Sequence, residues 1–178
     1  LVLRLWHHLI HDHESHALMD VEVDAELAGR EDALTGSRPF RNLVAETQLG
    51  GERAEEHQRY FRSLLGDIEE PTAPFGLVDV RGDGRGIEEA RQRVEAGVMD
   101  RLRAQARRLG VSVASVCHVA YAQVLSRVSG REDVVFGVTV AGRPPEIAGI
   151  EGMVGLFINT LPLRIKLPPG QALIDLFK

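Results

Sequence analysis

Two amphipathic helices in direct succession constrain the fold more than any other feature of this sequence. Apolar residues at spacings of three and four predict a helix over 98–109, and Gly110 is expected to end it. A second helix is predicted to follow, with Ser112 or Ser115 as its N-terminal cap, and to end before Gly130. Each helix has an apolar stripe that must be covered, so the two are expected to pack on one common surface.

Two apolar runs that follow these helices can supply that surface. Residues 133–140 are rich in β-branched side chains and are predicted to form a buried strand. Residues 153–167 are a second predicted strand, in which Pro162 indicates an irregular or edge position because proline has no backbone N–H. Strands covered by paired helices indicate an α/β fold of the α+β sandwich kind.

The remaining sequence predicts further elements on both sides of a loose region. These are a strand over 1–6, a helix over 17–27 closed by Gly29, a helix over 40–65 interrupted at Gly50, a strand over 87–94 and a helix from 171 onward. The stretch 69–86 is rich in Pro and Gly and is the expected boundary between two parts. Because the chain starts and stops inside predicted elements, we interpret it as an excerpt of a longer protein.

The composition is that of a globular protein with one core, since 44% of the residues are hydrophobic and 26% are charged. The net charge is −5, and the Lys and Arg residues are interleaved with Asp and Glu along the sequence. Both observations argue against nucleic acid as a partner. No apolar stretch approaches the ~20 residues of a membrane span, so we expect no membrane partner. A single cysteine, Cys117, excludes a disulfide framework and favours a cytoplasmic location. We assign Cys117 to core packing.

Histidines gather near the start of the chain. Asp12 lies among five of the seven, which are His7, His8, His11, His13 and His16. An imidazole titrates near neutrality, so a histidine held at a strand-to-helix turn by a carboxylate can accept a proton at working pH. His8 and Asp12 are the pair that we favour for this chemistry.

Two other interpretations of the histidines stay open at this point. A zinc site is one, but two residues separate His8 from His11 where the HxHxDH signature of metal-dependent hydrolases requires one, and HExxH is absent. The other is that the histidines are solvated loop residues. We expect this for His11, His13 and His16 taken individually.

Two motifs in order carry a resemblance to a known family. Residues 7–12 read HHLIHD and match HHxxxD, the beginning of the HHxxxDG motif of condensation domains from nonribosomal peptide synthetases. Residues 154–164, VGLFINTLPLR, resemble the second signature of that family, [IV]GxFxNTLxxR. His13 replaces the motif glycine and puts a side chain where a tight turn is expected. The resemblance covers essentially the whole chain.

The resemblance implies a chloramphenicol-acetyltransferase-like fold of two lobes, both of them incomplete in this chain. Residues 1–75 would form the C-terminal part of the N-terminal lobe, with the HHxxxD motif and a linker, and residues 76–178 the first part of the C-terminal lobe. A tunnel between two complete lobes would hold the motif near its middle. We therefore expect this piece to be inactive by itself.

The resemblance also implies an activity, that of an acyltransferase that forms amide bonds. A donor acyl or peptidyl thioester would react with an acceptor aminoacyl thioester, each carried on the phosphopantetheine arm of a peptidyl carrier protein. An adenylation domain would be adjacent, and neither a metal nor another directly bound cofactor is expected. An epimerisation domain of the same fold, a non-catalytic docking module and a zinc hydrolase are the alternatives.

The resemblance assigns roles to three catalytic and two substrate-binding residues. His8 would accept the proton of the attacking amine or orient that amine, and His7 would help to shape the turn. Asp12 would order the turn by pairing with a basic residue in a segment outside this chain. Asn159 and Gly155 are the expected substrate contacts, and a buried Asn159 amide would need hydrogen-bond partners.

Overall fold

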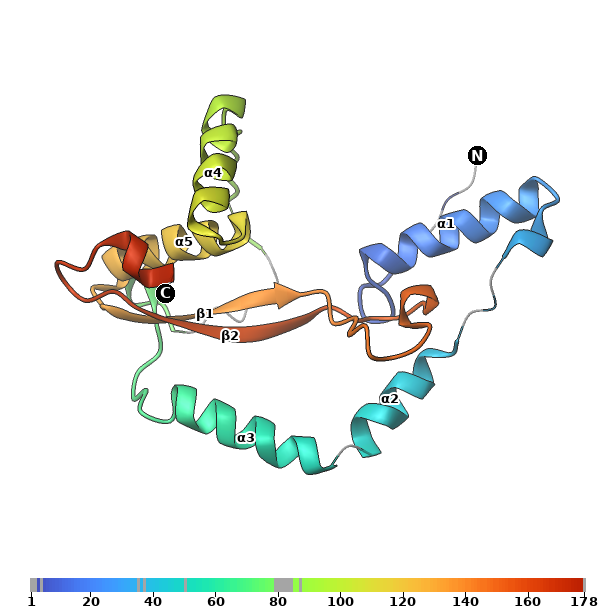
Figure 1. Ribbon diagram of the computed structural model, residues 1–178, viewed down its shortest axis with the longest axis horizontal. Coiled ribbons are helices and arrows are strands. Elements are labelled where there is room, and N and C mark those ends of the chain that lie inside the picture. The colour runs from blue at the N-terminus through green and yellow to red at the C-terminus, as the bar shows by residue number, and fades with distance from the viewer. Residues whose placement is uncertain are drawn as a thin grey trace. The chain divides into compact units, whose positions relative to one another are not determined.

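The computed structural model describes residues 3, 5–34, 36, 38–49, 51–78, 85–86 and 88–177 (Figure 1). The helices in these residues are α1 (His13–Leu27), α2 (Phe40–Leu49), α3 (Gly51–Leu65), α4 (Ala96–Leu109) and α5 (Val113–Ser129), and the strands are β1 (Asp133–Val140) and β2 (Asn159–Lys166). Short 3-10 turns lie at Glu31–Ala33, Pro74–Gly76, Ile150–Gly152 and Leu173–Phe177. The mixture of helices and strands agrees with the predicted α/β class.

Contacts between residues divide the chain into two compact units. The first unit holds Leu1–Ser63 and Gly137–Leu161, and the second holds Leu64–Phe136 and Pro162–Lys178. Each unit is therefore built from two segments that are far apart in the sequence. The assignment of residues 1–75 and 76–178 to two family lobes stays a prediction.

In the second unit, α4 and α5 end where the sequence predicts, whereas α4 begins two residues earlier than expected, at Ala96. Gly110 adopts a left-handed φ of 69° and ends α4, and the Ser112 hydroxyl accepts the backbone N–H of Ser115 at 2.9 Å to cap α5. Helix α5 packs against the strands (Figure 1) through a core of Ala122, Leu125, Val134, Phe136, Ile165 and Leu167. The predicted packing of a helix on a strand surface is thus confirmed for α5.

Cys117 does not belong to this core, so its assignment to core packing is wrong. The residue lies on α5 but is exposed. The buried stripe of the helix runs through Val119, Ala122 and Leu125. At 3.6 residues per turn, Cys117 falls on nearly the opposite face of the helix from that stripe.

Strands β1 and β2 pair in a two-stranded sheet. The backbone N–H of Leu167 donates to the carbonyl of Glu132 at 2.6 Å. Further along β1, a Cβ added to Gly137 would contact the side chain of Thr160. Partner numbers fall on β2 as they rise on β1, so the strands are antiparallel.

The prediction for β1 is confirmed with the same bounds, 133–140. The second predicted strand is correct only from Asn159 onward, and residues 153–158 lie outside β2. The backbone N–H of Phe157 donates to the Asp12 carboxylate at 3.0 Å. A group used in this way cannot also join a strand ladder, which explains why the strand starts later than predicted.

Three expected elements are not found among the described residues. Leu3, Leu5 and Trp6 are not in a strand, and the other positions of the expected strand over 1–6 lie outside the described residues. Residues 88–94 have no regular structure, because four of the seven are charged and few apolar side chains are left to cover. The C-terminal segment forms a 3-10 turn in place of the expected α-helix. Residues 79–84 and 87 also lie outside the described part.

The first unit has its own apolar core, which joins α2 to the loop between the strands. Its members are Ile150, Met153 and Phe157, with Phe40, Leu43 and Ile147 packed against them. The rings of Phe40 and Phe157 meet edge to face with centroids 5.1 Å apart. The predicted interruption of the long helix is confirmed, since α2 ends at Leu49 and α3 begins at Gly51.

No single helix in the described part of the chain has both the length and the hydropathy that a membrane span requires. Helices α4 and α5 meet them only when taken as a pair, and that pair is bent by 105°.

Arg164 holds two carboxylates in the second unit. Its Nε donates to Asp133 at 2.9 Å, and a terminal nitrogen donates to Asp67 at 2.9 Å. The Arg164 side chain is only 8% exposed. Hydrogen bonds from Arg164 lower the pKa of Asp67 to about 2 and also lower the pKa of Asp133, against a smaller desolvation effect that raises each.

This arrangement predicts that the stability depends on pH. Asp67 has an ordinary unfolded-state pKa of roughly 4 and a folded-state pKa of about 2. Its contribution is therefore complete above pH ~4 and is lost as the pH falls toward the folded-state value. We expect Asp67→Asn to lower the melting temperature at neutral pH, and the difference from wild type to shrink steadily between pH ~4 and pH ~2.

Melting curves recorded across this pH range test the prediction. Glu69→Gln removes an exposed carboxylate nearby and serves as the matched control. We expect its melting temperature to differ less from that of wild type, and by nearly the same amount at every pH. If the melting temperature of Asp67→Asn is as far below that of wild type at pH ~2 as at neutral pH, the ion pair with Arg164 is not the cause of the difference.

Candidate active site

Helix α1 begins where it does because Asp12 caps it. The Asp12 backbone is extended, and its Oδ1 accepts the backbone N–H of Ser15 at 3.0 Å and the Ser15 hydroxyl at 2.9 Å. An aspartate at this position satisfies a free N–H of the first turn and is favoured by the helix dipole. The motif residues His7 to His11 therefore form a separate turn that precedes the helix.

The second oxygen of Asp12 reaches the loop between the strands. Oδ2 accepts the backbone N–H of Phe157 at 3.0 Å, and the residue is 2% exposed. Burial alone would raise the pKa of Asp12, but hydrogen bonds from Ser15 and Phe157 and the charge of Arg143 outweigh it and lower that pKa. Asp12 is thus an ionised acceptor whose two oxygens are both used inside the protein.

Ser15 is a buried residue that sequence reasoning missed. Its hydroxyl lies 2.7 Å from the carbonyl oxygen of Gly155 and accepts the backbone N–H of Gly155 at 3.0 Å. A Cβ on Gly155 would overlap the Phe40 ring. Gly155, an expected substrate contact, is buried; its backbone N–H donates to Ser15, and its carbonyl shares the single hydroxyl hydrogen of Ser15 with Asp12. An Asp three residues before a Ser at a helix start was the only available signal for this contact.

Arg143 joins the start of α1 to the same loop. One terminal nitrogen donates to the carbonyls of Ile150 at 2.6 Å and Met153 at 2.9 Å, and the other lies 3.5 Å from Asp12 Oδ1. Its guanidinium carbon lies 3.7 Å from the ring centroid of Phe157, a cation–π distance. The expectation that the basic partner of Asp12 lies outside this chain is wrong, because Arg143 provides that charge.

His7 and His8 have different roles in the turn. The Nδ1 of His7 accepts the backbone N–H of Leu9 at 3.0 Å, and its carbonyl accepts the N–H of Ile10 at 3.1 Å. The Nδ1 of His8 lies 2.9 Å from the carbonyl oxygen of His11. A carbonyl can only accept, so His8 Nδ1 must carry a hydrogen, and Nε2 is the nitrogen with a free lone pair when the ring is neutral.

His8 lies on the wall of a pocket of about 340 Å³ in the first unit. The other lining residues are Thr139, Leu156, Ile158, Asn159 and Thr160. Asn159 is exposed and not buried as expected, and its Oδ1 accepts the backbone N–H of Thr160 at 2.8 Å. The amide nitrogen carries two hydrogens that can donate to a bound molecule. Gly155 does not line this pocket.

Comparison with known proteins decides the family. A family model described as "Condensation domain" matches residues 1–178. This chain belongs to the condensation-domain family. Malpibaldin synthetase of Mortierella alpina is 50% identical over 165 residues, which cover 92% of this chain and 3% of that protein. Malpinin synthetase of the same organism is 46% identical over 165 residues, which cover 92% of this chain and 2% of that protein.

Solved structures confirm the expected chloramphenicol-acetyltransferase-like fold. The first condensation domain of the CDA synthetase matches with a TM-score of 0.74 and 28% sequence identity. The match covers 96% of this chain and 39% of that one. The chain thus spans well under half of a solved condensation domain and a small fraction of its curated relatives.

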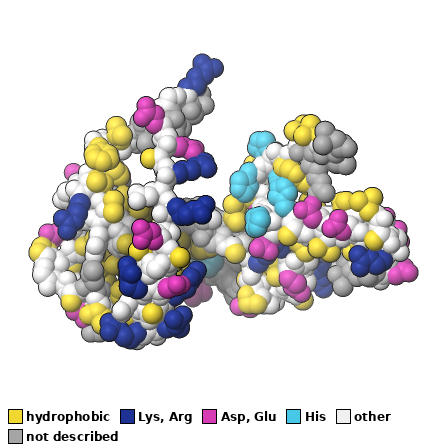
Figure 2. Space-filling view, turned by 90° about the horizontal axis from the view of Figure 1, so that it is seen from above, with side chains coloured by type: hydrophobic (Ala, Val, Ile, Leu, Met, Phe, Trp, Pro, Cys, Tyr) yellow, Lys and Arg dark blue, Asp and Glu magenta, His cyan; other side chains and the backbone are white. Residues whose placement is uncertain are grey.

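The histidines that follow His8 in this condensation-domain chain differ in burial. Figure 2 shows the histidine side chains gathered on one face of the first unit. His13 is exposed as expected, but it lies in the first turn of α1 and not in a loop. Its backbone is not left-handed, so its replacement of the motif glycine costs no strain. His11 is buried and His16 half-buried, so the expectation that they are solvated loop residues is wrong. No described group of three His, Cys, Asp or Glu side chains could hold a metal.

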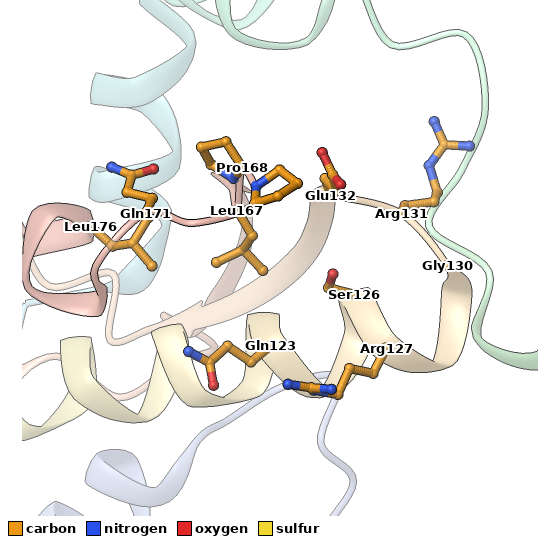
Figure 3. A pocket seen from close by; sticks show the side chains of 11 residues that line it. Gln123, Ser126, Arg127, Gly130, Arg131, Glu132, Leu167, Pro168, Gln171 and Leu176 are labelled. Atoms are coloured by element: carbon orange, nitrogen blue, oxygen red, sulfur yellow. The ribbon is translucent and has the colours of Figure 1, made fainter.

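A larger pocket of about 740 Å³ lies entirely in the second unit (Figure 3). It is formed by the C-terminal part of α5, the turn that follows and the segment after β2. Its polar lining residues include Gln123, Arg127 and Gln171. None of the HHxxxD residues lines it, so its size alone does not make it the candidate active site.

Proposed function

We propose that this chain is the part of a condensation domain that carries its general base, and that the complete domain forms an amide bond between two carrier-bound thioesters. The observation that carries this proposal is the orientation of His8. Its Nδ1–H is held by the carbonyl of His11, so its Nε2 is the basic nitrogen and belongs to a ring that lines the pocket. The synthetase names of two similar proteins agree with this activity.

In this reaction the acceptor amine attacks the carbonyl carbon of the donor thioester. A C–N bond forms, the C–S bond breaks, and the thiol of the donor arm leaves. His8 Nε2 takes the proton that the amine loses and can return it to the departing thiolate, so that no proton or electron is left over. Holding two tethered substrates together would supply much of the remaining rate.

The other motif residues serve the site in different ways. We assign His7 and Asp12 to the shape of the turn, because His7 binds the backbone of Leu9 and both Asp12 oxygens are used inside the protein. Asn159 can donate its amide hydrogens to a substrate carbonyl. Carrier proteins with phosphopantetheine arms, a neighbouring adenylation domain and a cytoplasmic location complete the proposal, with no cofactor bound directly to this chain.

The test uses the complete condensation domain with a donor and an acceptor carrier protein, each loaded with its thioester. We expect a product in which both substrates are joined on the acceptor carrier, detected by mass spectrometry of the intact carrier. Incorporation of solvent deuterium at the Cα of the donor without joining would instead indicate epimerisation. Binding of the carriers with neither reaction would indicate a docking module and would contradict the proposed function.

A further inference from the structure

His11, His16 and Trp6 form a cluster of stacked rings that the proposed mechanism does not use. The ring centroids of His11 and His16 are 4.3 Å apart, and Trp6 lies 4.8 Å from His11 and 4.3 Å from His16. His11 is 5% exposed. A buried imidazole is thus enclosed by two aromatic neighbours immediately beside the residue proposed as the base.

The two histidines of this cluster are joined by a hydrogen bond. Their Nε2 atoms are 2.6 Å apart, which requires one hydrogen between the two nitrogens. His11 Nδ1 is buried and has no hydrogen-bond partner among the described residues. The contact with His16 is therefore the polar interaction that fixes how the His11 ring lies in its buried site.

The backbone of His11 meets His8 directly. The carbonyl oxygen of His11 lies 2.9 Å from His8 Nδ1, and the two rings are 6.3 Å apart. The direction of this carbonyl depends on the backbone at residue 11, which the buried ring restrains. Loss of the bond to Nδ1 would free the His8 ring to exchange tautomers and to rotate away from the pocket.

We propose that His11 and His16 are positioning residues for His8: their hydrogen-bonded rings hold the His11 carbonyl in place, and this carbonyl selects the tautomer that leaves Nε2 as the base. The inference rests on the proposed function for its catalytic consequence. The effect on the tautomer and orientation of the His8 ring does not depend on the proposed function.

Two variants of His16 in the complete domain separate the hydrogen bond from ring packing. His16→Phe keeps an aromatic ring beside Trp6 and His11 but cannot bond to His11 Nε2, whereas His16→Gln keeps a polar group that can. We expect His16→Phe to slow single-turnover amide formation by roughly ten- to hundredfold, the effect seen when the partner that orients a metal-bound histidine is lost. His16→Gln should retain most of the rate.

The nitrogen-15 spectrum of the His8 ring reports its tautomer. A purely structural role of His16 would leave this spectrum unchanged. We expect one Nδ1–H tautomer in wild type and in His16→Gln, and a mixture in His16→Phe. His13→Gln changes an exposed neighbouring histidine and should leave both spectrum and rate unchanged. Melting curves verify that each variant is folded.

The two readouts distinguish failure of the inference from failure of the proposed function. An altered His8 tautomer in His16→Phe without a change in rate would support the positioning role and count against His8 as the base. An unaltered tautomer in the folded His16→Phe variant would overturn the inference, whatever the rate.

Discussion

Replacement of His8 by alanine in the complete condensation domain should slow amide formation roughly 10²–10⁴-fold, the usual contribution of a positioned general base. The substitution removes Nε2 from the pocket wall, and none of the other described residues that line the cavity has a titratable side chain to take its place. The affinity for loaded carrier proteins should be unchanged, because the change is confined to that wall. Product formation in a single turnover, followed by mass spectrometry beside carrier binding, measures both effects.

Variants of neighbouring histidines serve as controls for this result. His13→Ala removes an exposed side chain and should leave the rate near wild type. His7→Ala should be milder than His8→Ala, because it loses one hydrogen bond within the turn and no group in the pocket. Near-wild-type rates for His8→Ala would exclude both a base and an essential orienting role for His8.

Asp12→Asn is expected to have the largest effect on stability. Oδ1 accepts from Ser15 and Oδ2 accepts from Phe157, so both carboxylate oxygens act only as acceptors in a buried place. An amide has one such oxygen, and its NH₂ group would face an N–H or O–H donor on the other side. Leaving buried donors unpaired and Arg143 without its carboxylate should lower the free energy of unfolding by about 3 kcal/mol.

Denaturant unfolding of the two proteins at neutral pH measures this difference. Glu14→Gln is the matched control, since it makes the same chemical change on an exposed side chain in the first turn of α1. We expect a shift within about 0.5 kcal/mol for that control. An Asp12→Asn variant as stable as wild type would mean that the buried carboxylate is not needed to hold the loop between the strands.

Helix α5 and strand β1 were predictable because they follow from periodicity and end signals, whereas the expected strands over 1–6 and 87–94 were not found among the described residues. Strand β1 was found at 133–140 as predicted, but the second strand was predicted to be too long. Residues 153–157 alternate between buried and partly exposed as a strand would. Their backbone groups, however, bond to the side chains of Arg143, Ser15 and Asp12. A sequence pattern reports burial and cannot distinguish a strand from a loop held in this way.

Within the candidate site, the residues that belong to the two family motifs were predictable. His8 and Asn159 come from two motifs far apart in the sequence and line one pocket, although Asn159 is exposed where burial was expected. Arg143 and Ser15 were not predicted as site residues, because their contacts connect positions more than a hundred residues apart. The burial of His11 could not be predicted either, since it depends on rings that only the folded turn brings together.

The contacts of the buried polar cluster have a consequence for how this family can vary. Asp12, Ser15 and Arg143 all bond to backbone N–H or C=O groups of the loop between the strands, and every non-proline residue offers the same groups. The contact between Gly155 and Phe40 is different, because it involves the Phe40 side chain. A larger residue at position 155 would overlap the Phe40 ring and would require a smaller residue at position 40. Among diverged sequences, correlated substitutions should therefore connect positions 40 and 155, whereas the polar cluster should leave almost no covariation between its side chains and the loop.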